Sequence, residues 1–146
     1  MYRVLIVDDH AAVRQGVRQL LDERFDLDAP GEASNADEAI EMVQHDRWDV
    51  VILDVNMPGK GGMEALKAMK RSNPGLPIIM FSVFPPEQVA RRFLAAGASG
   101  YVSKGGSAED LVSAVRRAVG GGSNGPIAAG AVDSLNPDDA VTAWHL

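Results

Sequence analysis

The chain has 146 residues and a formal net charge of −6, and its length suits one domain with a substantial apolar core. It contains no cysteine, so disulfide bonds, thiolate metal sites and cysteine nucleophiles are excluded. The acidic balance argues against direct nucleic-acid binding, and no apolar run is long enough for a membrane span or a signal peptide. We therefore expect a cytoplasmic protein that contacts neither membrane nor DNA directly.

Four apolar runs and one weaker segment predict five strands along the first 119 residues. They lie near residues 4–7, 27–33, 50–53, 78–81 and 100–103. The first, third and fourth runs are continuously apolar, which is typical of strands buried on both faces. The second run contains Pro30 and Gly31 and therefore suits the edge of a sheet.

Apolar residues at helical spacing follow the strands and predict five helices. The clearest stripes are Val13, Val17, Leu20 and Leu21, then Ala36, Ala39, Ile40 and Val43, and finally Leu111, Val115, Ala118 and Val119. Pro86 suits the first turn of the fourth helix, and Ser107 with Asp110 predicts an N-cap for the fifth. Repeated β-α units with right-handed crossovers predict an α/β fold with a doubly wound parallel sheet.

The composition changes at Gly120. Residues 120–126 are rich in glycine, as linkers are, and the remainder to Leu146 is rich in alanine with few large apolar residues. We expect residues 1–119 to form one domain and residues 120–146 to be a largely disordered Gly/Ala-rich linker or tail.

Chemically active side chains follow four of the predicted strands. Asp8 and Asp9 follow the first, Asp54 the third, Ser82 the fourth and Lys104 the fifth. Each alone has an ordinary explanation as a turn, capping or solvated loop residue. Together they would meet outside the carboxyl ends of a parallel sheet, where such folds bind ligands. Crowded carboxylates repel each other, and a bound Mg²⁺ with its preference for oxygen ligands would relieve that repulsion.

Three fragments in this order, with Ser82 at the end of the intervening strand, resemble the receiver domain of two-component response regulators. They are RVLIVDDH at 3–10, LDVNMPG at 53–59 and GASGYVSK at 97–104. The LuxR/NarL-type subclass is the most similar, and the resemblance covers about residues 2–119. It implies a flavodoxin-like (βα)5 fold with strand order 2-1-3-4-5, in which the first and third strands are adjacent at the topological switch point.

The resemblance also implies the partner and the chemistry. A sensor histidine kinase would donate a phosphoryl group to Asp54, which would form an acyl phosphate. Mg²⁺ would be held by Asp9, Asp54 and the backbone carbonyl of Asn56, with Asp8 acting mainly through metal-bound water. The chain would be a signalling switch in transcription regulation that catalyses its own phosphoryl transfer and slow dephosphorylation, rather than a turnover enzyme.

The remaining roles concern the response to phosphorylation. Lys104 would pair with one phosphoryl oxygen, and Ser82 would hydrogen-bond another. Tyr101 would be the aromatic residue whose orientation follows Ser82. His10 is interpreted as an exposed residue entering the first helix rather than as a metal ligand. A homodimer through helix faces is compatible with the resemblance, with the first and fifth helices or the fourth-helix region as candidate surfaces.

Three alternatives have distinguishable signatures. A phosphorylation-independent interaction module is compatible with the stiff Pro85-Pro86 loop, although the retained acidic, serine and lysine positions argue against it. A Mg²⁺ phosphohydrolase would need a second aspartate where Asn56 stands, together with a substrate cap. A DNA-binding regulator would need a helix-turn-helix output, and residues 120–146 lack the length and the periodicity for one. A natural single-domain receiver, a truncated chain and a foreign tail all remain compatible with that segment.

Overall fold

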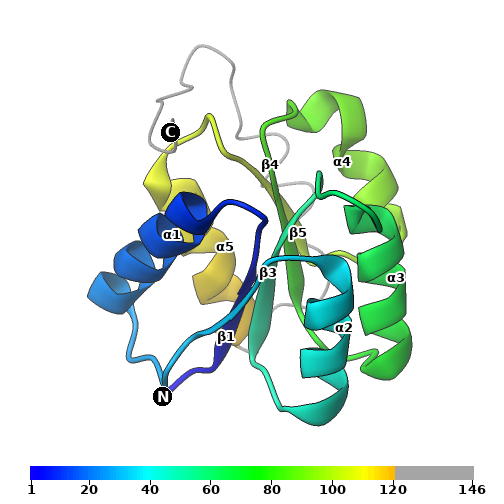
Figure 1. The fold of residues 1–146 in the computed structure, drawn as a ribbon. Helices are drawn as coiled ribbons and strands as arrows, with labels where there is room; N and C mark the ends of the chain where they lie inside the picture. The colour runs from blue at the N-terminus through cyan, green and yellow to red at the C-terminus, as the bar shows by residue number, and fades with distance from the viewer. Residues whose placement is uncertain (121–146) are drawn as a thin grey trace.

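Five parallel strands form one sheet in the order β2-β1-β3-β4-β5, which confirms the predicted topology (Figure 1). The computed structural model describes residues 1–120, so the predicted tail of residues 120–146 lies outside the described residues except for Gly120. The strands are β1 (Val4–Val7), β2 (Gly31–Ala33), β3 (Val50–Asp54), β4 (Ile78–Ser82) and β5 (Gly100–Ser103). Val7 lies opposite Leu53, so the residues that follow β1 leave the sheet beside the end of β3.

Helices cover both faces of the sheet, with α1 and α5 on one face and α2, α3 and α4 on the other (Figure 1). The helices are α1 (Ala11–Arg24), α2 (Ala36–His45), α3 (Gly62–Ser72), α4 (Pro86–Ala95) and α5 (Ala108–Val119). Alternate residues of β1 enter opposite cores: Val4 and Ile6 pack under α1 and α5, whereas Leu5 and Val7 pack under α2 and α3. Burial on both faces explains why the central strands are continuously apolar.

Local signals at the helix ends are confirmed. Pro86 begins α4, and Ser107 and Asp110 form a reciprocal capping box at the start of α5. A helix start leaves backbone N–H groups unpaired. Pro86 has no N–H to pair, and the capping box accepts the N–H groups of Ser107 and Asp110. In the described part of the chain, no helix combines the length and the apolar character that crossing a bilayer requires.

The second strand is shorter than the sequence predicts. The predicted run spans residues 27–33, but β2 begins only at Gly31, and Leu27 contributes an isolated bridge to Tyr2. Pro30 has no N–H for a ladder hydrogen bond, which accounts for the break. A Cβ on Gly31 would lie 2.3 Å from the ring of Trp48, so the closeness of this aromatic side chain also favours glycine at the edge strand.

Two neighbouring glycines before and at the start of α3 offer a matched test of packing. A Cβ on Gly62 would lie 2.7 Å from Val55 Cα and 2.8 Å from Val55 O, whereas a Cβ on Gly61 would meet nothing within 4 Å. We expect Gly62→Ala to lower the free energy of unfolding by about 1–3 kcal/mol, because the backbone that follows Asp54 must move. Gly61→Ala is expected to be nearly neutral. Urea unfolding of both variants measures the difference, and equal stabilities would contradict this packing.

Candidate functional site

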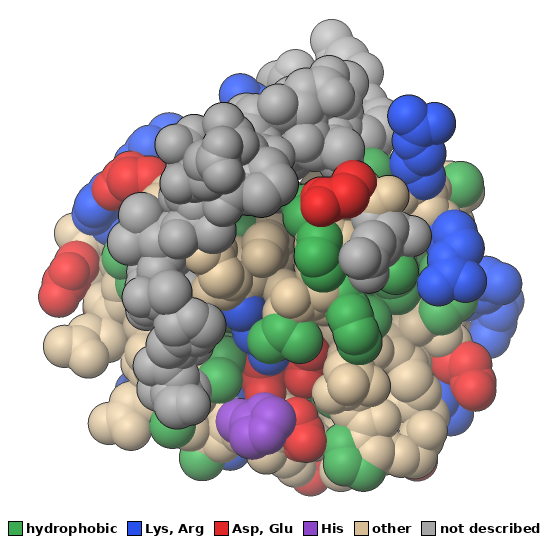
Figure 2. Space-filling view, turned by 90° about the horizontal axis from the view of Figure 1, so that it is seen from above, with side chains coloured by type: hydrophobic (Ala, Val, Ile, Leu, Met, Phe, Trp, Pro, Cys, Tyr) green, Lys and Arg blue, Asp and Glu red, His purple; other side chains and the backbone are tan. Residues whose placement is uncertain are grey.

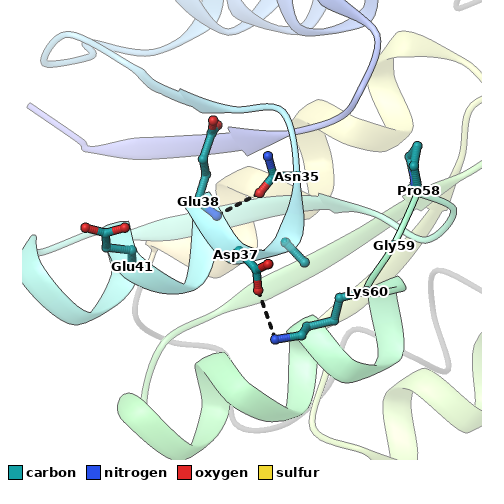
Figure 3. A pocket seen from close by; sticks show the side chains of 8 residues that line it. Asn35, Asp37, Glu38, Glu41, Pro58, Gly59 and Lys60 are labelled. Atoms are coloured by element: carbon teal, nitrogen blue, oxygen red, sulfur yellow. Dashed lines mark hydrogen bonds and ion pairs between the residues drawn. The ribbon is translucent and has the colours of Figure 1, made fainter.

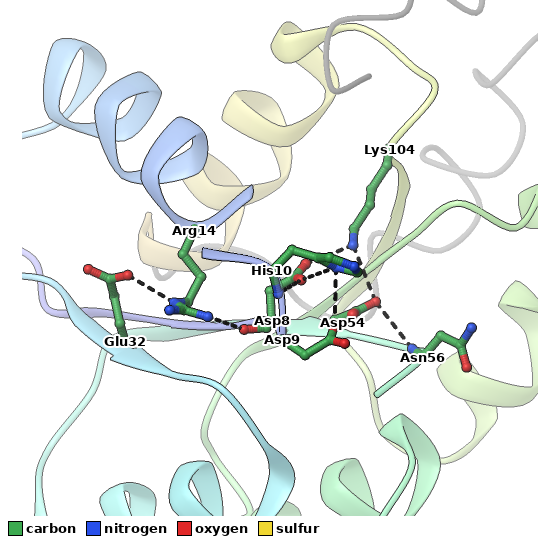
Figure 4. A network of polar contacts seen from close by, with 8 residues as sticks. All are labelled: Asp8, Asp9, His10, Arg14, Glu32, Asp54, Asn56 and Lys104. Atoms are coloured by element: carbon green, nitrogen blue, oxygen red, sulfur yellow. Dashed lines mark hydrogen bonds and ion pairs between the residues drawn. The ribbon is translucent and has the colours of Figure 1, made fainter. Parts of the chain in front are cut away.

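The predicted site residues converge at the carboxyl edge of the sheet (Figure 4). Asp8 and Asp9 follow β1, Asp54 ends β3, Ser82 ends β4, and Lys104 follows β5. Four of these five side chains are buried, and Asp9 is partly exposed. Figure 2 looks down on this edge and shows acidic side chains and a histidine gathered beside apolar ones.

Lys104 forms ion pairs with two of the carboxylates. Its Nζ lies 2.7 Å from Asp8 Oδ2 and 3.3 Å from Asp54 Oδ1. Buried charges need partners of opposite sign, and here one ammonium serves two carboxylates. The structure therefore brings Asp8, Asp54 and Lys104, from three different strand ends, into one cluster.

Asp54 has an unusual electrostatic environment. The pKa of its carboxyl is raised from 3.8 to about 6, mainly by burial; the nearby Asp8 carboxylate adds to the rise, and Lys104 opposes it. The backbone N–H of Asn56 donates a hydrogen bond to Asp54 Oδ1 at 3.1 Å. The Asn56 side chain is exposed and points away from the carboxylates (Figure 4). Near neutral pH the Asp54 carboxyl is still mainly ionised, but its charge is poorly solvated.

Asp9 supplies an oxygen without a hydrogen-bond donor. Its Oδ1 is buried and accepts no hydrogen bond from the described residues, although His10 Nδ1 approaches it to 3.2 Å outside hydrogen-bond geometry. One ligand atom each from Asp8, Asp9, His10 and Asp54 lies within 4.8 Å of the others. An oxygen-rich cluster with an unsatisfied acceptor fits a hard divalent cation.

The structure adds His10 to the predicted cluster. The side chain is exposed, as the sequence analysis expects, and its backbone N–H donates a hydrogen bond to Asp8 Oδ1 at 2.9 Å. Its ring also lies 3.2 Å from Asp8 Oδ1. In the sequence, His10 directly follows the two aspartates, which could have indicated a place in the cluster. The sequence does not show whether its ring points towards the carboxylates.

Ser82 and Tyr101 meet at one backbone position. The N–H of Phe84 donates to Ser82 Oγ, and the Tyr101 hydroxyl donates to the Phe84 carbonyl, each at 3.0 Å. Tyr101 is fully buried rather than a half-exposed edge residue, and it packs against Phe93. Burial raises the pKa of its hydroxyl. The serine and the aromatic ring therefore contact the same segment between β4 and α4.

A separate hollow of about 480 Å³ lies beside the site, between the start of α2 and the loop after β3 (Figure 3). The charged lining residues are mostly acidic, and Lys60 Nζ lies 2.9 Å from Asp37 Oδ1 across it. The Asn35 side chain already accepts the backbone N–H of Glu38 at the helix start. None of the carboxylates that cluster with Lys104 lines this hollow, so the two features are distinct.

Comparison with known proteins identifies the family. Residues 4–116 match the response regulator receiver domain, and the chain therefore belongs to this family. Its members act generally in signalling rather than in metabolism. The sheet order and the acidic cluster at its carboxyl edge agree with that assignment.

Similar proteins place the chain near regulators of the LuxR class. It is 39% identical over 121 residues to the response regulator UvrY of Escherichia coli (strain K12), covering 83% of this chain and 56% of UvrY. The chain thus spans about half the length of this relative.

Two solved structures share the fold. A LuxR-family two-component response regulator from Aurantimonas sp. SI85-9A1 superposes with a TM-score of 0.80 at 31% identity, covering 91% of this chain and 96% of that one. The isolated REC domain of RcsB from Salmonella enterica serovar Typhimurium, with the phosphomimetic BeF3−, has a TM-score of 0.78 at 27% identity, covering 90% and 96%.

Proposed function

We propose that this chain is a phosphorylation-controlled receiver in which Asp54 accepts a phosphoryl group from a sensor histidine kinase. The observation that carries the proposal is the buried Asp54 carboxylate, with Lys104 at 3.3 Å and with Asp8 and Asp9 in the same cluster. The family assignment supports a signalling role, and RcsB gives a related receiver prepared with a phosphomimetic.

The reaction requires the ionised form of Asp54. A carboxylate oxygen attacks the phosphorus of the phosphohistidine, a P–O bond forms, the P–N bond breaks, and the imidazole leaves with the bonding pair. Because its pKa is about 6, most Asp54 is ionised at neutral pH. Burial leaves the carboxylate poorly hydrated, so little solvation must be removed before it attacks.

Lys104 is placed to bind the transferred group. The phosphoryl oxygens carry negative charge through the transfer, and an ammonium within hydrogen-bond reach of Asp54 would stabilise them. The lysine is already held beside Asp54 by its contact with Asp8, so it needs little reorganisation.

The cluster also fits Mg²⁺, which would neutralise carboxylate charge and bind a phosphoryl oxygen. Asp9, Asp54 and the backbone carbonyl of Asn56 would be its ligands, with Asp8 acting through a water molecule. The buried Asp9 Oδ1, which accepts no hydrogen bond from the described residues, supports this assignment.

Ser82 and Tyr101 would convert the modification into a change of shape. Ser82 Oγ accepts the Phe84 N–H, which leaves the hydroxyl proton available for a phosphoryl oxygen. A shift of Ser82 towards the phosphoryl group would pull on Phe84, whose carbonyl also holds Tyr101. The exposed side chains of Val83 and Phe84 would move with this segment and present a changed surface to an output or partner.

Intact-mass measurement tests the proposal. Incubation with phosphoramidate and Mg²⁺ is expected to add one phosphoryl group to the wild-type chain and none to Asp54→Ala. Omission of Mg²⁺ is expected to suppress the gain, and a histidine kinase with its phosphohistidine should donate the same group. Equal phosphorylation of Asp54→Ala, or no uptake by the folded wild-type chain, would refute the assignment.

A further inference from the structure

Arg14 joins the acidic cluster to the edge strand. Its Nη1 donates to the backbone carbonyl of Asp8 at 2.6 Å, and its Nε donates to Glu32 Oε1 at 3.0 Å (Figure 4). Arg14 lies on α1 and Glu32 on β2. Arg18, one turn further along α1, reaches the other oxygen of Glu32 at 3.3 Å. The Glu32 carboxylate therefore orients the guanidinium of Arg14, which at the same time donates to the backbone of Asp8.

The bound carbonyl belongs to the peptide group that joins Asp8 to Asp9. The N–H of Asp8 is fixed by the carbonyl of Ala33 at 3.1 Å, so the chain is anchored as it leaves β1. The next peptide unit is rigid and planar, and the direction of its carbonyl fixes the position from which the Asp9 side chain projects. Arg14 holds that carbonyl with a charge-assisted hydrogen bond.

The side chain of Asp9 is less firmly held than that of Asp8, because its close contact is with the exposed His10 ring, 3.2 Å from Asp9 Oδ1. Its Oδ1 accepts no hydrogen bond from the described residues, whereas Asp8 is held by Lys104 and by the His10 backbone. We propose that Arg14, oriented by Glu32, is a positioning residue for cation binding, because it fixes the Asp8–Asp9 peptide and thereby directs the Asp9 carboxylate into the cluster. The inference rests on the proposed function in taking Mg²⁺ as the cation.

Electrostatics and positioning predict opposite effects of removing Arg14. A cation beside an acidic cluster repels Mg²⁺, so the loss of its charge alone would tighten metal binding. Loss of the hydrogen bond to the Asp8 carbonyl would weaken Mg²⁺ binding, because residues that orient metal ligands typically contribute 10- to 100-fold in metal affinity. Arg18 is the matched control, since it carries the same charge on the same helix and contacts the same glutamate without reaching Asp8.

The primary measurement is Mg²⁺ affinity by calorimetry, without a phosphodonor. We expect Arg14→Ala to bind Mg²⁺ about tenfold more weakly than wild type. Arg18→Ala is expected to bind it equally or slightly more tightly. Arg14→Lys should recover part of the affinity, because an ammonium can still donate to the Asp8 carbonyl but cannot also hold Glu32 in the same fork.

A metal-free readout separates positioning from general damage. In NMR spectra of the folded protein with EDTA, the amide signals of Asp9 and His10 are expected to shift or broaden in Arg14→Ala and to stay in place in Arg18→Ala. Unchanged or tighter Mg²⁺ binding by Arg14→Ala, or equal loss in Arg18→Ala, would overturn the inference.

The proposed function is tested separately by phosphoryl uptake. If the wild-type chain accepts a phosphoryl group but Arg14→Ala keeps its Mg²⁺ affinity, only the positioning role fails. If Arg14 controls Mg²⁺ affinity but Asp54 remains unmodified, only the phosphoacceptor role fails.

Discussion

Replacement of Lys104 with methionine is expected to slow phosphoryl uptake at Asp54 by about a hundredfold, as measured by time-resolved intact mass with phosphoramidate and Mg²⁺. Methionine keeps much of the length of the side chain but removes the ammonium that lies 3.3 Å from Asp54. The loss should fall mainly on the rate at saturating Mg²⁺ rather than on the affinity for the metal, because Lys104 is a cation and not a ligand.

Lys60→Met provides the control for this experiment. Lys60 is on the loop after β3 and pairs with Asp37 at the surface. Its replacement removes one positive charge and leaves the acidic cluster unchanged. Its phosphorylation rate is expected to stay within about twofold of wild type, since exposed ion pairs contribute little. Equal rates for Lys104→Met and wild type would show that the ammonium does not act on the transferred group.

Asp54→Asn is expected to make the metal-free protein more stable at neutral pH. Burial raises the pKa of this carboxyl from 3.8 to about 6, so ionising it costs more in the folded state than in the unfolded chain. Well below pH 3.8 both states are protonated and the penalty vanishes. As the pH rises to about 6 the unfolded chain releases its proton first, and wild-type stability falls. Above that pH the penalty reaches about 3 kcal/mol.

Urea unfolding in EDTA at pH 4 and at pH 7.5 measures this difference. We expect Asp54→Asn to exceed wild type by up to about 3 kcal/mol at pH 7.5 and by less than about 1 kcal/mol at pH 4. Asp37→Asn, an exposed aspartate away from the cluster, should show no such pH-dependent gain. A gain that is equal at the two pH values would contradict the assignment of the penalty to the ionised Asp54.

The apolar pattern was sufficient to predict a doubly wound parallel sheet, whereas the strand order came from the resemblance to receiver domains. Continuous apolar strands define which segments are central, and strand ends in a parallel sheet necessarily share one edge. Asp8, Asp54 and Lys104 could thus be grouped without coordinates. The capping pair Ser107 and Asp110 was equally accessible, because both residues lie within one turn of the chain.

Contacts that depend on side-chain direction were not predictable. Arg14 and Glu32 are 18 residues apart on different elements, and each reads as an ordinary solvated charge. Tyr101 in a short edge strand gives no sign of whether its ring points inward, and the structure shows it fully buried. The start of β2 was also misplaced, because Pro30 reads as the sign of an edge strand rather than as a break within residues 27–33.

The hydrogen bonds that connect Ser82 and Tyr101 allow the side chains of the loop after β4 to vary in sequence. Both are made to main-chain atoms of residue 84, so every amino acid there except proline offers the same donor and acceptor. Val83 and Phe84 direct exposed side chains to solvent. Substitutions at residues 83 and 84 can therefore change the surface that a binding partner contacts. The hydrogen bonds from Ser82 and Tyr101 to the backbone of residue 84 would remain.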